Sequence, residues 1–225
     1  MTAPTPAPRA ASAAVRRLAA DLALLPPSCG PVRLIAVDGH AGSGKTTFAA
    51  VLAEALDGAP VLHLDDFATH TELFAWTDRL LRQVITPLGR GEPARYAPYD
   101  WNARAFGAPR SLAPAPVVLL EGVGAGRRDL RPELARVLWM EYERGAAWER
   151  GRRRDGPAQH SFWERWVAAE QEHFAGDPTL PFADLVVRQG TLGYEVSAGP
   201  ASTGGPTEAV GTSRPHQSVT EREAQ

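Results

Sequence analysis

Short apolar runs alternate along the chain with longer segments whose apolar residues recur at helical spacing. The runs are mostly apolar without an alternating polar pattern, as expected of parallel strands that are buried on both faces. The segment 13–25 shows the helical pattern, with Val15, Leu18, Leu22 and Leu25 on one face. Strands that alternate with helices predict an α/β fold, in which helices cover both faces of a parallel sheet. The predicted strands are 33–38, 61–64, 117–120, 137–140 and 183–187, and the predicted helices are 13–25, 45–57, 72–85 and 160–174.

These elements belong to one domain, because 225 residues are enough for one sizeable α/β unit and few for two. We expect residues 13–195 to form this domain as a three-layer fold with a five-stranded parallel sheet. Residues 1–12 are rich in Ala and Pro and predict a disordered lead-in rather than a targeting segment. Residues 196–225 lack Phe, Trp and Tyr and predict a disordered tail.

The composition limits the cellular compartments and the binding partners that are plausible for this chain. The formal net charge of −2 argues against broad electrostatic binding to nucleic acid or to an anionic membrane. No apolar run is long enough for a membrane span. The single cysteine, Cys29, fits a reducing compartment, so we expect a cytoplasmic protein. Lys45 is the only lysine among 24 basic residues, which suggests a position where a compact ammonium is required.

Residues 39–46 (GHAGSGKT) match the pattern G-x-x-x-x-G-K-[ST] and lie between a predicted strand and a predicted helix. Glycines let successive backbone N–H groups turn around an anion, and the helix N-terminus adds its positive dipole end. Lys45 is expected to reach the β- and γ-phosphates of ATP, and the Thr46 hydroxyl to bind Mg²⁺. The predicted nucleotide-binding residues of this loop are Gly39, Ala41, Gly42, Ser43, Gly44, Lys45, Thr46 and Thr47.

Acidic residues end two other predicted strands. Asp65 and Asp66 follow the strand at 61–64, and Glu121 follows the strand at 117–120. Ligands of open α/β sheets bind beyond the carboxyl ends of the strands, so we expect these acids to converge on the phosphates. Phosphoryl transfer needs one carboxylate that accepts the proton of the acceptor hydroxyl and others that hold Mg²⁺. Asp66 is equally compatible with capping a turn.

Several short segments, taken in order, resemble the uridine kinase group of P-loop kinases, to which phosphoribulokinase and bacterial pantothenate kinase are related. The likeness covers about residues 32–190. It rests on the phosphate loop and on the segments Leu64–Phe67 (LDDF), Pro98–Trp101 (PYDW), Leu120–Gly122 (LEG), Arg150–Asp155 (RGRRRD) and Phe182–Val187 (FADLVV).

The resemblance implies that Asp65 is the base that faces the acceptor hydroxyl and that Glu121 is associated with Mg²⁺. It implies that Asp78 grips the ribose hydroxyls of a nucleoside and that Tyr99 lines the nucleoside pocket. Residues 144–158 correspond to a lid whose arginines close over the phosphates. The predicted catalytic residues are therefore Lys45, Asp65 and Arg154, and the predicted Mg²⁺ ligands are Thr46, Asp65 and Glu121. Arg150 and Arg153 of the lid are predicted to contact the nucleotide. The predicted substrate-binding residues are Asp78, Tyr99 and Arg104.

The chain departs from the family pattern at two positions. Arg104 stands where the pattern has a histidine near the base, and Gly151 stands where the lid carries a second adjacent arginine. The arginine run is more typical of a kinase lid than of a nucleic-acid patch in this slightly acidic chain. Trp163 and Trp166 are interpreted as packing residues rather than as base-stacking residues. Glu170, on the same helix, is interpreted together with His173 as part of a solvated polar face rather than as a metal site.

The leading hypothesis is a kinase that transfers the γ-phosphate of ATP to a hydroxyl, with a nucleoside such as uridine as the first acceptor to consider. A second hypothesis keeps the fold and replaces the acceptor with a vitamin or a sugar alcohol. A third is a nucleotide-binding switch that hydrolyses the nucleotide slowly and acts on a protein partner. A switch does not need a base that faces a hydroxyl, so Asp65 and the arginine lid favour a kinase. The sequence leaves the oligomeric state open.

Overall fold

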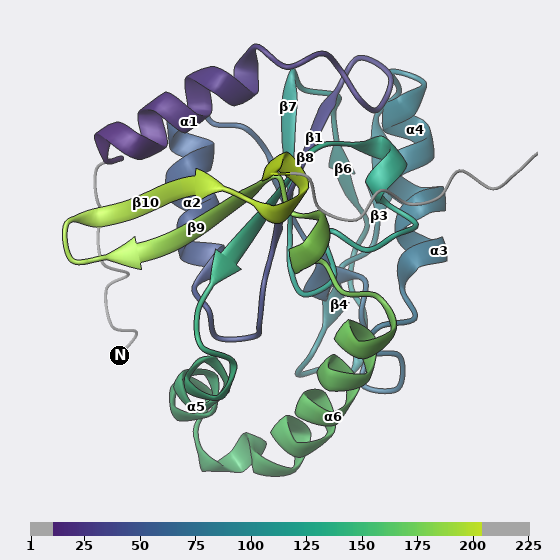
Figure 1. Ribbon diagram of the computed structural model, residues 1–225. Coiled ribbons are helices and arrows are strands. Elements are labelled where there is room, and N and C mark those ends of the chain that lie inside the picture. Colours follow the sequence, from purple (N-terminus) through teal and green to yellow (C-terminus); the bar gives the residue numbers. More distant parts are fainter. Residues whose placement is uncertain (1–10, 204–225) are drawn as a thin grey trace, which may run out of the picture.

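Residues 11–203 are described by the computed structural model in Figure 1. Their main sheet has six strands in the order β10-β9-β8-β1-β7-β2. The five strands from β9 to β2 run parallel to one another, which confirms the predicted parallel sheet. The strands of this sheet are β1 (Arg33–Asp38), β2 (Val61–His63), β7 (Val117–Glu121), β8 (Leu134–Glu141), β9 (Leu185–Gly190) and β10 (Gly193–Ala198).

The sixth strand, β10, pairs antiparallel with β9 and is absent from the sequence prediction. Tyr194 and Val196, two residues apart, pack against the apolar core, and the Tyr194 ring lies 4.9 Å from the Phe48 ring. Two half-buried apolar residues among polar ones do not form an apolar run, so the strand gave little signal. A 3₁₀ turn, η6 (Pro200–Thr203), follows.

The expected start of a disordered tail at residue 196 is therefore wrong, because residues 196–203 form part of a strand and a turn. The remainder of the expected tail, 204–225, lies outside the described residues, as do residues 1–10 of the expected lead-in.

Helices cover both faces of the sheet, and β1 shows why. Ile35 and Val37 point to the apolar cluster under α1 and α2, whereas Leu34 and Ala36 belong to the cluster on the opposite face. The alternation of side chains along a strand thus serves two cores, which explains the mostly apolar runs. The covering elements are α1 (Ala13–Ala23), α2 (Lys45–Ala55), α3 (Thr77–Leu80), the π-helical turn η2 (Leu81–Ile85) and α4 (Thr86–Gly89).

The predicted helix at 72–85 is displaced in the structure. Helical backbone begins at Thr77 and continues to Gly89 through the wider turn of η2. This wider turn precedes Pro87, whose missing N–H removes one bond of the regular helical ladder. The apolar side of this stretch, formed by Leu80, Val84 and Leu88, is fully buried against the sheet.

Two further helices project beyond the carboxyl ends of the parallel strands, α5 (Arg144–Asp155) and α6 (His160–Gly176) (Figure 1). The segment between α4 and β7 (Val117–Glu121), which is rich in Pro, forms two small antiparallel pairs. Within residues 11–203, helices long and apolar enough to cross a membrane are absent. The small strands are β3 (Ala94–Tyr96), β4 (Tyr99–Asp100), β5 (Ala105–Phe106) and β6 (Arg110–Leu112).

Candidate active site

The loop between β1 and α2 has the backbone that an anion cradle requires. Gly39, Gly42 and Gly44 have φ angles of 143°, 84° and 100°, which L-amino acids with side chains rarely adopt. A Cβ atom on Gly42 would also lie 2.0 Å from the carbonyl oxygen of Ala147. Glycine at this position therefore allows the loop to pass directly beneath α5.

The polar groups of this loop suit a phosphate chain. Lys45 is buried, and its Nζ donates a hydrogen bond of 3.0 Å to the carbonyl oxygen of His40. Within residues 11–203, nothing hydrogen-bonds to the buried Ser43 hydroxyl, and no side chain caps the start of α2. An anion at the helix N-terminus would satisfy these groups. Thr46 and Thr47 lie exposed in the first turn of α2, where the Thr46 hydroxyl fits a role as a Mg²⁺ ligand.

Asp38, the last residue of β1, ties the start of the loop to the segment that follows β7. Its Oδ1 accepts hydrogen bonds from the N–H groups of Gly39 (2.7 Å) and Gly124 (2.8 Å). Its Oδ2 accepts from the N–H of Gly126 (2.9 Å) and from the Thr179 hydroxyl (2.6 Å). Four donors satisfy this fully buried carboxylate. This role could not be predicted from the sequence, because three of the four donors come from distant segments.

The acids predicted to converge do so at adjacent strand ends. Glu121 ends β7 and faces His63 of β2 across the sheet, with 2.7 Å between Glu121 Oε2 and His63 Nδ1. This hydrogen bond is the main reason that the pKa of His63 is raised. Asp65 follows in the 3₁₀ turn η1 (Leu64–Asp66). Asp65 is exposed, yet the many protein atoms nearby desolvate its carboxyl, and this desolvation, together with the charge of Glu121, raises its pKa, whereas Lys45 opposes the shift.

Two of the predicted lid arginines lie over the site. The Arg150 guanidinium approaches the phosphate loop, with Nη1 3.6 Å from the position that a Cβ on Gly44 would occupy. Arg154 donates hydrogen bonds of 2.7 and 3.1 Å to the two carboxylate oxygens of Asp155. This pairing raises the pKa of Arg154, and Asp65 adds to the shift through its charge. Arg154 therefore carries a permanent positive charge on the side of α5 that faces the acids.

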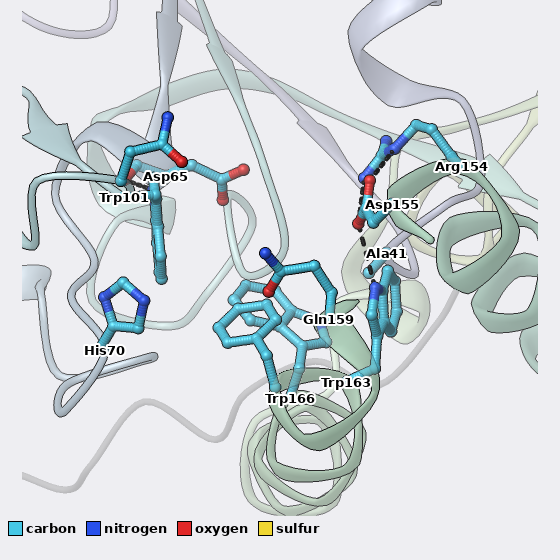
Figure 2. Close-up of a pocket in the computed structure, with 11 residues that line it drawn as sticks. Ala41, Asp65, His70, Trp101, Arg154, Asp155, Gln159, Trp163 and Trp166 are labelled. Atoms are coloured by element: carbon cyan, nitrogen blue, oxygen red, sulfur yellow. Dashed lines mark hydrogen bonds and ion pairs between the residues drawn. The ribbon is translucent and has the colours of Figure 1, made fainter. Parts of the chain in front are cut away.

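A cavity of about 360 Å³ opens between Asp65 and the helices α5 and α6 (Figure 2). Trp101 lies on the Asp65 side, and its indole N–H donates to the Asp65 carbonyl oxygen at 3.2 Å. On the opposite side the Trp163 indole donates to Asp155 at 3.0 Å. The walls combine aromatic rings with a few polar groups, as binding sites for small molecules commonly do. The lining residues are Ala41, Asp65, His70, Trp101, Asn102, Arg154, Asp155, Gln159, Phe162, Trp163 and Trp166.

Tyr99 and Arg104 do not line the cavity. The Tyr99 hydroxyl is 3.0 Å from His70 Nδ1, and its ring packs edge-on against Trp101 at 5.2 Å between ring centres. Tyr99 thus holds two lining residues in place. Arg104 occupies the turn between β4 and β5 with a φ of 56°. Desolvation chiefly lowers the pKa of His70, and the charge of Arg104 lowers it further.

Two other predicted site residues lie away from the cavity. Asp78 has a side chain that is 82% exposed on α3, and its nearest cation is Arg82, at 3.8 Å. Its helix turns the opposite face to the core through Leu80, so Asp78 faces solvent. Arg153 forms an ion pair of 2.6 Å with Glu149 on the exposed face of α5. The structure therefore separates both side chains from the cavity that Asp65 and Arg154 line.

Residues on α6 are more important to the site than the sequence indicated. The interpretation of Glu170 as a solvated polar residue is wrong, because its side chain is completely buried and hydrogen-bonds to the phosphate loop. Trp163 and Trp166 are buried, as their interpretation as packing residues requires, and they also border the cavity. The spacing of four residues between Trp166 and Glu170 was the available signal, since it places an indole and a carboxylate on one helical face.

No protein-family model matches this chain, and no curated protein matches it in sequence. Among solved structures, a possible uridine kinase from Bacillus stearothermophilus is similar with a TM-score of 0.59 and 19% sequence identity. The match covers 76% of this chain and 96% of that chain. The chain has the fold of a P-loop NTPase.

Two further solved structures match this chain with lower TM-scores. A proposed fructose transport system kinase from Silicibacter sp. TM1040 has a TM-score of 0.46 and 22% identity, covering 62% of this chain and 80% of that chain. The YGR205w protein has a TM-score of 0.49 and 13% identity, covering 76% of this chain and 90% of that chain.

Proposed function

We propose that the protein is a small-molecule kinase that transfers the γ-phosphate of ATP to a hydroxyl group. The observation that carries this proposal is the position of Asp65. Asp65 lines the aromatic cavity together with Ala41 of the phosphate loop, and its carboxylate interacts electrostatically with Lys45. An acceptor in the cavity could therefore present its hydroxyl to both Asp65 and the γ-phosphate. The similarity of the fold to a possible uridine kinase supports the same reading.

In this proposal the donor binds along the phosphate loop. The backbone N–H groups at the start of α2 hold the phosphates, and the Lys45 ammonium neutralises the β- and γ-phosphate oxygens. Thr46, Asp65 and Glu121 would hold Mg²⁺ directly or through waters. Mg²⁺ commonly binds proteins through one or two carboxylates together with substrate phosphates, so this small set is sufficient. When bound, the ion would withdraw electron density from the phosphate oxygens and so favour attack at the γ-phosphorus.

The acceptor enters the cavity, and its hydroxyl gives its proton to Asp65 as the oxygen attacks the γ-phosphorus and ADP leaves. A raised pKa makes this carboxylate a better proton acceptor than an ordinary aspartate near neutral pH. Arg154 lies beside the cavity and would stabilise the charge that develops on the transferred group. Arg150, above Gly44, would contact the phosphates of the donor.

A nucleoside such as uridine is the first acceptor that we propose, because a flat ring can pack against the aromatic side chains that line the cavity. The position of Asp78 favours an acceptor that does not depend on that carboxylate for its hydroxyl contacts. A vitamin or a sugar alcohol therefore remains the alternative acceptor. A slow nucleotide switch is a weaker candidate, because a switch has no use for a cavity beside the base.

The test is the release of ADP from ATP–Mg²⁺ in the presence of a panel of nucleosides, pantothenate and sugar alcohols. We expect one acceptor to accelerate ADP release and to appear as its phosphate ester. Asp65→Asn should lower the turnover with that acceptor by about a hundredfold or more, within the usual range for a general base, while ADP still binds. Flat and slow ADP release across the whole panel would contradict the kinase and favour the switch.

The variant Asp78→Asn tests whether Asp78 contacts the ribose of a nucleoside, as the resemblance implies, or faces solvent, as in the structure. A direct contact with the ribose would raise the KM for a nucleoside by roughly tenfold, as expected for a lost hydrogen bond to a charged group. An exposed residue outside the cavity would leave that KM unchanged. We expect the second result.

A further inference from the structure

Glu170 of α6 is a buried carboxylate with four hydrogen-bond donors. Its Oε1 accepts from His40 Nδ1 at 2.7 Å and from the Trp148 indole at 3.0 Å. Its Oε2 accepts from the backbone N–H of Ala41 at 3.2 Å and from the Trp166 indole at 2.9 Å. A carboxylate only accepts, so the proton of His40 must reside on Nδ1. Each oxygen therefore joins one group of the phosphate loop to one tryptophan.

The two tryptophans come from different helices, Trp148 from α5 and Trp166 from α6. Both α5 and α6 are thus attached to the same two residues of the phosphate loop through one side chain. Trp166 and Ala41 also line the cavity, which means that this connection joins the cavity wall to the loop.

The chemistry of the cluster requires a charged carboxylate. Burial by itself raises the pKa of Glu170, but the hydrogen bonds from His40 and Trp166 and the nearby charge of Lys45 outweigh it, and the pKa lies below its usual value. Four donors aimed at two oxygens leave no place for a proton or for an amide N–H₂ group. Glutamine has one oxygen and would leave two of the donors without an acceptor.

We propose that Glu170 is a positioning residue that couples the acceptor cavity to the nucleotide site by holding the His40–Ala41 segment and the Trp148 and Trp166 indoles as one unit. This inference rests on the proposed function, because it assumes that nucleotide binds at the phosphate loop. If the carboxylate only stabilised the fold, its replacement would change only the free energy of unfolding. A positioning carboxylate would also set the affinity of the loop for nucleotide in the fully folded protein.

The first experiment compares the affinity for MgADP of the wild type, Glu170→Gln and Glu172→Gln, by calorimetry at a temperature where circular dichroism shows each variant folded. Glu172 is an exposed residue of the same helix and serves as the matched control. We expect Glu170→Gln to bind MgADP about tenfold more weakly, within the usual range of coupling between sites, and Glu172→Gln to match the wild type. Saturating MgADP should change the tryptophan emission of the wild type but not that of Glu170→Gln.

Equal MgADP affinity in Glu170→Gln and Glu172→Gln, or an unaltered emission change, would overturn the positioning role and leave the kinase proposal standing. Absence of MgADP binding to the wild type would overturn both. If Glu170→Gln does not fold, Trp166→Phe replaces it, since this change removes one indole donor and keeps an aromatic ring. Weaker MgADP binding by Trp166→Phe supports the coupling, and wild-type affinity refutes it.

Discussion

Gly151 lies in α5 directly against the indole of Trp163. A Cβ atom at this position would stand 2.3 Å from the ring, far inside van der Waals contact. The departure from the family pattern at this position thus has a packing reason, because a second arginine beside Arg150 would displace Trp163 from the cavity wall. Trp163 also donates its N–H to Asp155, so both its ring and its polar atom are fixed.

Gly151→Ala should therefore destabilise the protein although alanine is the better helix former. Overpacking costs about 1–3 kcal/mol, and the gain in helix propensity returns at most about 1 kcal/mol. We expect a net loss of about 1–2 kcal/mol in urea unfolding. Gly176→Ala is the control, because among residues 11–203 no atom from elsewhere in the fold lies within 4 Å of a Cβ there. A Gly151→Ala protein as stable as the wild type would show that Trp163 can move aside.

At the scale of elements, the junction between β1 and the segment after β7 depends on one side chain. Asp38 receives two backbone N–H groups from Gly124 and Gly126, in addition to the N–H of Gly39 and the Thr179 hydroxyl. These bonds fix the direction in which the chain leaves β1 and enters the phosphate loop. Residues outside the phosphate-loop motif 39–46 thus determine the direction of the loop.

Asp38→Asn should lower the free energy of unfolding by about 3 kcal/mol, because an amide cannot accept at both ends and leaves buried donors unpaired. Thr179→Val removes a single donor and should cost less, about 1 kcal/mol. Denaturant titrations of both variants measure the difference. Similar losses in the two variants would mean that the hydroxyl, and not the backbone N–H groups, dominates this junction.

Local sequence patterns were enough to predict the strands that are buried on both faces and the loop that matches a known motif. The parallel strands, the phosphate loop and the acids Asp65 and Glu121 belong to this group, since their signal lies within a few neighbouring residues. The buried networks around Glu170 and Asp38 could not be predicted, because some of their hydrogen-bond partners lie more than a hundred residues away in the sequence. The role of Asp78 was implied by the resemblance alone, and its neighbours in the sequence carry no signal of whether it reaches the cavity.

For the whole molecule, nucleotide binding should appear as added stability. A ligand at one hundred times its Kd stabilises the folded state by about 2.7 kcal/mol, which raises the Tm of a protein of this size by roughly 5–11 °C. We expect MgADP to produce such a shift in the wild type. Lys45→Ala should reduce it strongly, because the buried ammonium is lost from the loop. Equal shifts in both proteins, measured by scanning calorimetry, would place the nucleotide elsewhere.

The antiparallel strand β10 limits how far the chain can be shortened for expression. Its pairing covers the hydrogen-bonding edge of β9, and Tyr194 contacts Phe48 of the core. A protein cut after Gly190 would expose unpaired N–H and C=O groups along β9, and open strand edges pair with other chains. A fusion partner or affinity tag therefore belongs after Thr203, where it leaves the pairing of β9 with β10 intact.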